Sequence, residues 1–292
     1  MIVTELANTG VFIPEIGIGT WNYHAGSAPL RKGLEAGALF IDTAESYGTE
    51  SAVGEAVRGM RNRVFIASKV SPQNFHRTEL RKSVDTSLRT MGVDIIDLLQ
   101  LHEPNPSIPI TETMGAMAEL VDAGKIRFVG VSNFSVEQLE RTLTLQEELR
   151  VARFKSVQNV LNYAVRAVDG PMRDLCSRWN VAIVTYSPLG AGFLTGKHEH
   201  GVEPGSRFAI IPGHQDVYFN DLARQRLRRL QSVATRAGVS VVELALAWAL
   251  HQPQVATVLV GGRSPAHLDQ ALRARSFHAP DLWRELDEGQ AQ

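Results

Sequence analysis

Residues 38–48 read ALFIDTAESYG, a short apolar run that ends on Asp42 and is followed by a turn carrying Tyr47. A run such as Leu39, Phe40 and Ile41 is typical of a strand that is buried on both faces. Seven further runs of this kind follow the same pattern along the chain: EIGIGT (15–20), RVFIASK (63–69), IIDLLQLH (95–102), IRFVGVSN (126–133), FKSVQ (154–158), VAIVTYS (181–187) and VATVLVGG (255–262). The sequence therefore predicts eight strands.

Amphipathic helices are predicted between these strands. Two connections carry apolar residues at helical spacing, namely Leu80, Val84, Leu88 and Met91 in the first and Met114, Met117, Leu120 and Val121 in the second. Ser135 followed by Gln138 predicts a capping box at the start of a further helix. Gly92 and Gly124 stand where two of the helices should end.

Eight strand–helix units predict an α/β fold of the (β/α)8 TIM barrel type, with residues 1–292 as a single domain. A doubly wound sheet usually has a glycine-rich phosphate turn after its first strand, and GIGTW (17–21) does not match that turn. The segment TELANTGVFIP (4–14) predicts a β-hairpin that caps one end of the barrel. The long connection 188–254 is predicted to lie over the other end.

Composition restricts the function classes. The chain has 292 residues, 30 Lys plus Arg and 31 Asp plus Glu, so its net charge gives no reason to expect nucleic acid or an anionic membrane as a partner. No uncharged apolar stretch approaches the roughly 20 residues of a membrane span, and the N-terminus lacks the pattern of a secretory signal. A single cysteine, Cys176, is expected to be a buried, inert thiol and suits a reducing compartment. We expect a cytoplasmic protein, and a monomer because no segment of the sequence has the pattern of an obligate interface.

The polar residues of the predicted strands gather at their C-terminal ends, where active sites lie in this fold. These ends are Thr20 with Trp21, Asp42, Lys69, His102, Ser132 with Asn133, Gln158, Tyr186 with Ser187, and the turn Gly261, Gly262, Arg263 and Ser264. Three successive strands thus end on an aspartate, a lysine and a histidine, with Tyr47 just beyond the first of them. We expect these four side chains to converge.

Their types indicate one chemistry. A buried Asp42 carboxylate needs a partner, and Lys69 on the adjacent strand is the natural one. The lysine charge is expected to lower the pKa of Tyr47 from its usual value near 10. A phenol tuned in this way can exchange a proton with an oxygen atom, which His102 would help to hold. The site would polarise a carbonyl group, and it contains no cluster of metal ligands.

Taken singly, each residue has an ordinary interpretation: a helix cap for Asp42, a solvated strand-end lysine for Lys69 and a loop histidine for His102. Tyr47 alone would usually be a packing residue with a hydrated hydroxyl. The coincidence of four suitable types at one predicted barrel rim favours the functional interpretation.

Several motifs resemble the aldo-keto reductase family in order and spacing along nearly the whole chain: GTW (19–21), FIDTAESYG (40–48), ASKV (67–70), LLQLH (98–102), GKIRFVGVSNF (124–134), SVQN (156–159) and YSPLG (186–190). The resemblance implies an NAD(P)H-dependent enzyme that reduces aldehydes and ketones to alcohols by hydride transfer. It implies Tyr47 as the general acid, Lys69 and Asp42 as the residues that tune it, and His102 as the residue that orients the substrate. Trp21, Tyr47 and His102 would form the substrate pocket.

The resemblance also implies a cofactor site. Ser132, Asn133 and Gln158 match the residues that bind the nicotinamide carboxamide, and Tyr186 matches the ring that stacks on the nicotinamide. Further matching positions along the cofactor are Thr20, Trp21, Asp42, Ser187, Leu189, Gly190, Gly261, Gly262, Arg263, Ser264 and His267.

The adenosine end departs from the family pattern. Val260 replaces a proline, and Gly261 and His267 stand where many relatives carry lysine and arginine. Arg263 and the following helix N-terminus would remain to bind a 2′-phosphate. We expect NADP(H), with Arg263 as its anchor, and NAD(H) stays open as the alternative.

The connection after His102 is short, so the sequence predicts an open pocket with an aromatic rim of Trp21, Tyr47 and Tyr23, suited to small aldehydes and ketones. Three other functions stay open. The first is a cofactor-sensing regulatory module with slow turnover. The second is a Schiff-base aldolase that uses Lys69, although Asp42 favours a charged, unreactive amine. The third is a metal hydrolase, supported only by HEH (198–200), which we interpret as a solvated loop.

Overall fold

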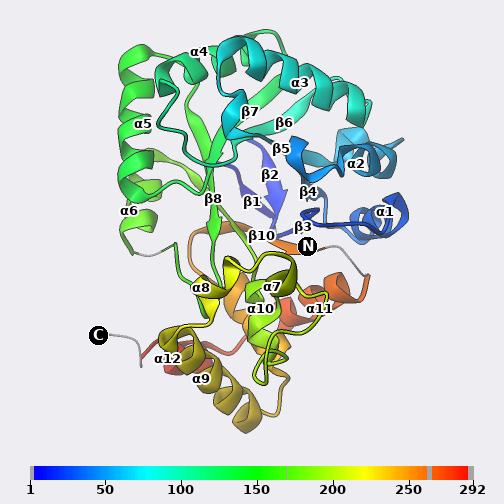
Figure 1. Cartoon of the computed structure of the whole chain (residues 1–292), viewed down its shortest axis with the longest axis vertical. Coiled ribbons are helices and arrows are strands. Elements are labelled where there is room, and N and C mark those ends of the chain that lie inside the picture. The colour runs from blue at the N-terminus through cyan, green and yellow to red at the C-terminus, as the bar shows by residue number, and fades with distance from the viewer. Residues whose placement is uncertain (1–2, 169, 262–264, 289–292) are drawn as a thin grey trace.

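The computed structural model describes residues 3–168, 170–261 and 265–288. Within these residues, eight parallel strands form a closed barrel in the order β10-β3-β4-β5-β6-β7-β8-β9 (Figure 1). The strands are β3 (Ile16–Gly19), β4 (Phe40–Asp42), β5 (Phe65–Val70), β6 (Ile96–Leu101), β7 (Ile126–Ser132), β8 (Phe154–Val160), β9 (Ala182–Tyr186) and β10 (Val255–Gly261). The predicted barrel and its eight strands are confirmed.

Helices cover the outside of the barrel. Those that connect successive strands are α1 (Ser27–Glu35), α2 (Glu50–Val57), α3 (Arg77–Met91), α4 (Ile110–Asp122), α5 (Val136–Leu149) and α6 (Gly170–Trp179). Helix α3 buries Leu80 and Val84 and ends at Gly92, whose φ of 63° is the left-handed conformation that glycine adopts without strain. Ser135 and Gln138 form the predicted capping box of α5.

A hairpin closes one end of the barrel, as predicted. Strands β1 (Val3–Glu5) and β2 (Phe12–Pro14) pair in antiparallel fashion. Leu6 and Ile13 of the hairpin are fully buried in one cluster with Phe40 and Leu98, which point into the barrel from β4 and β6. Apolar side chains therefore fill this end, and only the opposite end can hold polar chemistry.

The long connection after β9 folds over that opposite end. It contains the 3-10 helix η4 (Gly190–Thr195) and helices α7 (Arg207–Ile210), α8 (His214–Tyr218), α9 (Asp221–Ala237) and α10 (Val241–Leu250). In Figure 1 these elements lie together at the lower end of the view, with α11 (Pro265–Ser276) and α12 (Pro280–Asp287). The prediction of a segment over this face is confirmed.

One detail of this connection corrects the sequence interpretation. His198 is only 5% exposed and packs edge-on against Phe208 at 5.0 Å between ring centroids, with Phe219 at 6.1 Å. The HEH segment is therefore not a solvated loop at this position. Phe208 of α7 and Phe219, which follows α8, bury the histidine, and they lie too far along the chain for a local pattern to reveal the contact.

Two further expectations concern single elements. Cys176 is buried in α6, as predicted, and burial raises the pKa of its thiol to about 12, which disfavours the reactive thiolate. Among the described residues, no single helix is long and apolar enough to cross a membrane. Helices α9 and α10 reach that length and apolarity only when they are taken together, and they are bent by 105° at their junction.

Candidate active site

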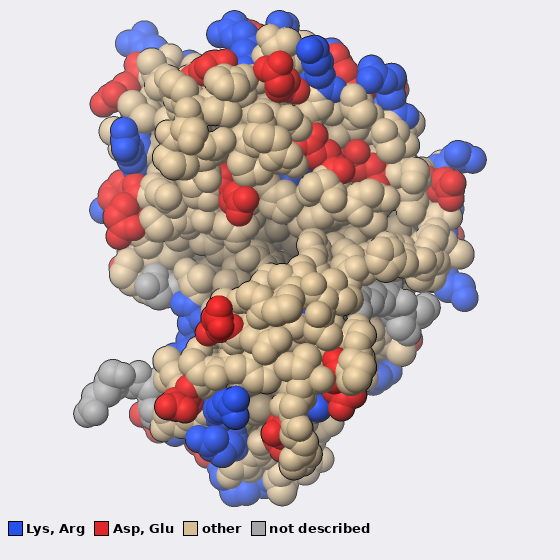
Figure 2. Space-filling model, viewed as in Figure 1, with Lys and Arg blue, Asp and Glu red and all other residues tan. Residues whose placement is uncertain are grey.

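A cavity of about 660 Å³ opens at the C-terminal ends of the strands. Figure 2 shows a hollow at the centre of one face, bordered mostly by uncharged residues. Most of the predicted site residues line the cavity: Trp21, Asp42, Tyr47, His102, Ser132, Asn133, Gln158, Tyr186, Ser187, Leu189, Gly261 and His267. Residues spread over the whole sequence therefore meet at one place.

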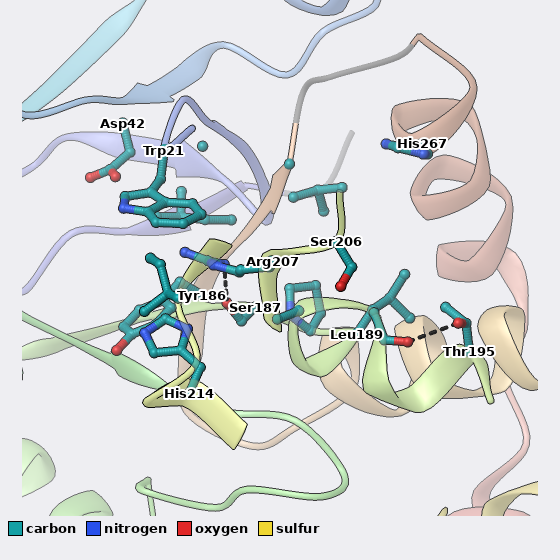
Figure 3. A pocket seen from close by; sticks show the side chains of 18 of the residues that line it. Trp21, Asp42, Tyr186, Ser187, Leu189, Thr195, Ser206, Arg207, His214 and His267 are labelled. Atoms are coloured by element: carbon teal, nitrogen blue, oxygen red, sulfur yellow. Dashed lines mark hydrogen bonds between the residues drawn. The ribbon is translucent and has the colours of Figure 1, made fainter. Parts of the chain in front are cut away.

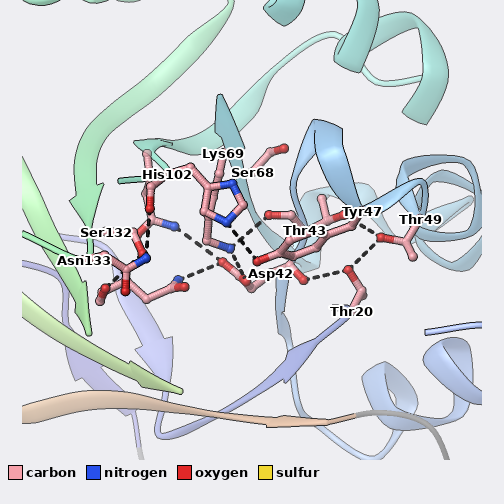
Figure 4. Close-up of polar contacts among 12 residues, drawn as sticks. Thr20, Asp42, Thr43, Tyr47, Thr49, Ser68, Lys69, His102, Ser132 and Asn133 are labelled. Carbon is pink, nitrogen blue, oxygen red and sulfur yellow. Dashed lines mark hydrogen bonds and ion pairs between the residues drawn. The ribbon is translucent and has the colours of Figure 1, made fainter. Parts of the chain in front are cut away.

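The four predicted catalytic side chains converge at the base of this cavity (Figure 4). Lys69 Nζ donates to Asp42 Oδ1 at 2.5 Å and to the carbonyl oxygen of Thr43 at 3.1 Å. The Tyr47 hydroxyl lies 3.3 Å from His102 Nε2, and Lys69 Nζ lies 5.1 Å from the centroid of the Tyr47 ring. The ion pair forms because β4 and β5 are hydrogen-bonded neighbours and each places its last inward-facing residue at the same rim.

Burial and charge act in opposite directions on these groups. Burial raises the pKa of Tyr47 above its usual value, and the charge of Lys69 offsets this only in part. The predicted net lowering of the tyrosine pKa is therefore wrong, although Lys69 itself acts in the predicted direction. Burial lowers the pKa of Lys69, but Asp42 and Tyr47 outweigh it, so the net shift is upward and the ammonium stays charged. Burial, with help from Lys69, lowers the pKa of His102 to about 4, so its imidazole is neutral at pH 7.

Asp42 also connects the catalytic group to the rest of the barrel. Its Oδ2 accepts from Gln158 Nε2 at 2.8 Å and, more weakly, from Gln100 Nε2 at 3.4 Å. This use of Nε2 leaves Oε1 as the acceptor that Gln158 can offer a ligand amide. Thr20, which was predicted to contact the cofactor, is fully buried instead, and its hydroxyl donates to the carbonyl oxygen of Asp42 at 3.0 Å. Thr20 therefore holds the backbone of Asp42 and does not itself line the cavity.

The amide-bearing residues form a connected arc next to His102. Asn133 Nδ2 donates to the carbonyl oxygen of His102 at 3.0 Å, and Asn133 Oδ1 accepts from the Tyr186 hydroxyl at 2.7 Å. Ser132 Oγ donates to the carbonyl oxygen of Gln158 at 3.0 Å. The flat ring of Tyr186 is thus fixed beside neutral hydrogen-bonding groups, a surface that fits a planar ring bearing a carboxamide.

Arg207 is the main residue that the sequence interpretation missed. It enters the cavity from the N-terminus of α7, with its guanidinium carbon 3.4 Å from the centroid of the Trp21 ring and Nη1 donating to Ser187 Oγ at 3.3 Å (Figure 3). The imidazole ring of His214 in α8 is stacked with the Trp21 ring, and their centroids are 6.5 Å apart. The only sequence signal was an arginine that follows a helix-capping serine, Ser206, within the one long connection.

The predicted rim is corrected on two points. Tyr23 is only 3% exposed and donates its hydroxyl hydrogen to the carbonyl oxygen of Gly26 at 2.6 Å, so it belongs to the core and not to the rim. Arg207 gives the rim a positive charge that the prediction of a purely aromatic, open rim left out. A guanidinium that lines a cavity can bind the phosphates of a dinucleotide.

The turn after β9 is tight. Ser187, Gly190, Ala191 and Gly192 all have positive φ, at 57°, 58°, 58° and 95°. The turn closes on itself, because the N–H of Gly190 donates to the carbonyl oxygen of Ser187 at 2.8 Å and that of Gly192 to the carbonyl oxygen of Leu189 at 3.1 Å. Gly190 does not line the cavity, because it packs against Tyr218, whose ring would lie 2.7 Å from any added Cβ. Ser187 and Leu189 do line it, as predicted.

The far end of the cavity holds Gly261, His267 and Gln270. Gly262, Arg263 and Ser264, which the sequence predicts at the adenosine end, lie outside the described residues. The lining therefore runs from the catalytic side chains, past the aromatic ring of Tyr186 and the turn after β9, to β10 and α11, and this order of groups fits a nicotinamide dinucleotide. Among the described residues, no group of three or more His, Cys, Asp and Glu side chains could hold a metal ion.

Comparison with known proteins identifies the class. The model of the aldo/keto reductase family matches residues 15–285. Aldo-keto reductase YhdN of Bacillus subtilis (strain 168) is 32% identical, over 92% of this chain and 87% of its own length. The chain belongs to the aldo/keto reductase family, and the predicted resemblance is confirmed.

Two solved structures agree. A thermostable aldo-keto reductase, Tm1743, in complex with the inhibitor epalrestat superposes with a TM-score of 0.78 at 30% identity, over 99% of both chains. An aldo/keto reductase from Klebsiella pneumoniae in complex with NADP and acetate gives 0.74 at 29% identity, over 95% of this chain and 92% of that one. The predicted oxidoreductase class is confirmed. The regulatory alternative is not favoured, because these three relatives, at 29–32% identity, are named as reductases, whereas the potassium channel β subunits that also match are 25–26% identical.

Proposed function

We propose that the chain reduces aldehydes and ketones to alcohols with NADPH as hydride donor and Tyr47 as general acid. One observation carries the proposal: the buried Lys69–Asp42 pair lies directly behind a tyrosine hydroxyl that faces the cavity and contacts His102. These four side chains together can protonate an oxygen atom, and they include no nucleophile with an adjacent base.

Each residue then has a defined task. Tyr47 is protonated at neutral pH, because burial raises its pKa, so its hydroxyl can give a proton to the carbonyl oxygen. The Lys69 ammonium stabilises the phenolate that remains, and Asp42 holds that ammonium in place. Neutral His102 can donate from Nε2 to the same carbonyl oxygen. The bound nicotinamide supplies the hydride.

For the cofactor we propose Gln158 and Asn133 at the carboxamide, Tyr186 against the nicotinamide ring, and Ser187 with Arg207 at the phosphates. NADP(H) is favoured, because a structural relative is described in complex with NADP. The contribution of Arg263 to binding a 2′-phosphate stays a prediction from the sequence, and NAD(H) stays the alternative. Separate titrations with NADPH and NADH, followed by tryptophan quenching, would decide between them.

The substrate class is small aldehydes and ketones, aromatic aldehydes included, because Trp21 and Tyr47 offer ring surfaces at the cavity. We further propose that residues 1–292 act as one domain and as a cytoplasmic monomer that binds no nucleic acid. The near-zero net charge supports the absence of nucleic acid, the single buried cysteine supports a reducing compartment, and the one closed barrel supports a single domain.

The test is NADPH oxidation with a panel of such carbonyl compounds, for the native chain and for Tyr47→Phe. We expect steady turnover by the native chain, and a loss of about 10²- to 10⁴-fold in kcat on removal of the acid. Binding of NADPH, measured by tryptophan quenching, should stay nearly unchanged. A native chain that oxidises no NADPH with any member of the panel would overturn the proposal. A single burst without steady turnover would instead support the regulatory alternative.

A further inference from the structure

Tyr47 differs from Lys69 in how the fold holds it. Lys69 is part of β5, a strand that pairs with β4 on one side and with β6 on the other, where Lys69 itself is paired with Gln100. Tyr47 lies on η1 (Glu45–Tyr47), a three-residue 3-10 turn between the extended residue Ala44 and Gly48, whose φ is 67°. Such a short turn has little stability of its own. The distance between the two catalytic side chains therefore depends on what ties η1 to the barrel.

The carboxylate of Glu45 provides that tie. Its Oε1 accepts from the backbone N–H of Ser71 at 2.6 Å and from Asn74 Nδ2 at 2.9 Å, and its Oε2 accepts from the hydroxyl of Ser83. Ser71 and Ser83 are at most 9% exposed. One side chain is thus bonded to the segment after β5, to η3 (Pro72–Asn74) and to α3. Bonds to an ionised acceptor are stronger than bonds between neutral groups.

The positions of these bonds matter for the reaction. Glu45 lies two residues before Tyr47, and its partner Ser71 lies two residues after Lys69. The bond therefore joins the turn that carries the acid to the residue that directly follows β5, the strand that carries the ammonium. The charge of Glu45 also raises the pKa of His102, against the larger effects of burial and Lys69.

Glu45 is not needed to hold the two strands together. Strand β4 pairs with β5 from Phe40 to Asp42, and the backbone N–H of Thr43 donates to the carbonyl oxygen of Ala67 at 2.9 Å. These bonds remain when Glu45 is removed, so its loss should release η1 without changing the barrel. We propose that Glu45 is a positioning residue, which holds the Tyr47 hydroxyl at the correct distance from Lys69 and His102 for proton transfer. The inference rests on the proposed reductase activity.

The experiment compares four variants in the full chain with NADPH and an aldehyde that the native chain reduces. Glu45→Ala removes the hydrogen bonds that the carboxylate accepts from Ser71, Asn74 and Ser83. Glu45→Gln keeps a neutral acceptor for Ser71 and Asn74. Ser83→Ala removes one bond and leaves the charge. Ser46→Ala is the matched control, because Ser46 belongs to the same turn and its side chain is exposed.

We expect Glu45→Ala to lower kcat by about 10- to 100-fold, because a misplacement of about 1 Å at a reacting group can cost up to that factor. The KM for NADPH should change by less than about twofold, since Glu45 does not line the cavity. The solvent isotope effect on kcat should increase as proton transfer becomes slower. Glu45→Gln should recover most of the loss, Ser83→Ala should show a small loss in the same direction, and Ser46→Ala should behave as the native chain.

Three results would overturn the inference: a Glu45→Ala variant with native kcat, equal losses in kcat and in NADPH affinity, or an unchanged isotope effect despite a lower kcat. If Glu45→Ala does not fold, as judged by thermal melting, Glu45→Gln and Ser83→Ala decide by the same criteria. A native chain that reduces no carbonyl compound refutes the proposed function itself. An active native chain with unaffected variants refutes only the role of Glu45.

Discussion

Two walls of the cavity are built in different ways. The catalytic wall consists of Asp42, Tyr47, Lys69 and His102, and its central ion pair has side chains only 1% and 4% exposed. The loop wall consists of Ser187, Arg207 and His214, all from the segment after β9. Arg207 is held there by the face of Trp21 and by a 3.3 Å bond to Ser187. The first wall is fixed by the barrel and, at Tyr47, by a turn bonded to it through Glu45. The second wall is fixed by contacts with Trp21 and within one connection.

This difference suits two tasks. Groups that stabilise developing charge act best when they are already oriented before the reaction, so that no reorganisation is needed. A long cofactor must enter and leave, and segments that move in this way are drawn from the less stable parts of a structure. We therefore expect substitutions in the catalytic wall to affect stability and kcat, and substitutions in the loop wall to affect mainly cofactor affinity.

Lys69→Met gives the largest expected effect. It leaves the buried carboxylate of Asp42 without its ammonium, and loss of one partner of a buried pair costs about 3–5 kcal/mol in the free energy of unfolding. The proposed reductase activity should also be lost, because the phenolate of Tyr47 would no longer be stabilised. Urea unfolding and the NADPH oxidation assay measure the two effects.

The double variant Asp42→Asn with Lys69→Met is the control for this prediction. It removes both charges, so it should be more stable than Lys69→Met alone while remaining inactive. A single variant as stable as the native chain would show that Asp42 finds enough compensation in Gln158 and Gln100, and the contrast between the two walls would then be much weaker.

The catalytic wall could be predicted from the sequence because topology fixes it. Parallel strands of a barrel end at one rim, so Asp42, Lys69 and His102 had to meet once the eight strands were recognised. The sign of the Tyr47 pKa shift could not be predicted in this way. Burial raises the pKa of Tyr47 and the charge of Lys69 lowers it. The sign of the net shift depends on which effect is larger, and their sizes depend on distances and exposure.

The loop wall could not be predicted for a different reason. The segment before α9 has short helices with no sustained periodicity, so nothing local indicates where Arg207 points or that His198 is buried by Phe208. Both depend on contacts between parts of one long connection. Thr20 was placed correctly at a strand end, but its hydroxyl faces Asp42 and not the cavity, because side chains alternate in direction along a strand.

Arg207→Ala gives a smaller expected effect. It removes the positive charge beside Ser187, so the affinity for NADPH should fall about tenfold, which corresponds to about 1.4 kcal/mol. The kcat at saturating NADPH should stay within about twofold of the native value, because Arg207 is not part of the proposed proton transfer. Arg224→Ala is the matched control, since Arg224 belongs to the same connection and lies over an aromatic ring, that of Phe219 at 5.8 Å, but is exposed and does not line the cavity. A large loss in kcat with unchanged affinity would contradict the division between the walls.

The smallest expected effect is a pH dependence of stability that distinguishes the walls. The folded-state pKa of His102 is about 4, well below the roughly 6.5 of an unfolded chain. As the pH falls below about 6.5, the unfolded chain therefore binds a proton that the folded chain does not, and the free energy of unfolding decreases.

The pKa of His214 in the loop wall is shifted in the same direction, since burial and Arg207 both lower it. Urea unfolding between about pH 7 and pH 5, above the usual range of exposed carboxylates, should show this slope. Glu50, whose carboxyl pKa is raised by burial, contributes alike to all the variants compared. His102→Asn should flatten the slope more than His214→Asn does, because the barrel keeps His102 from water more completely than the connection keeps His214. Equal flattening by the two variants would mean that the loop wall excludes water as well as the catalytic wall does.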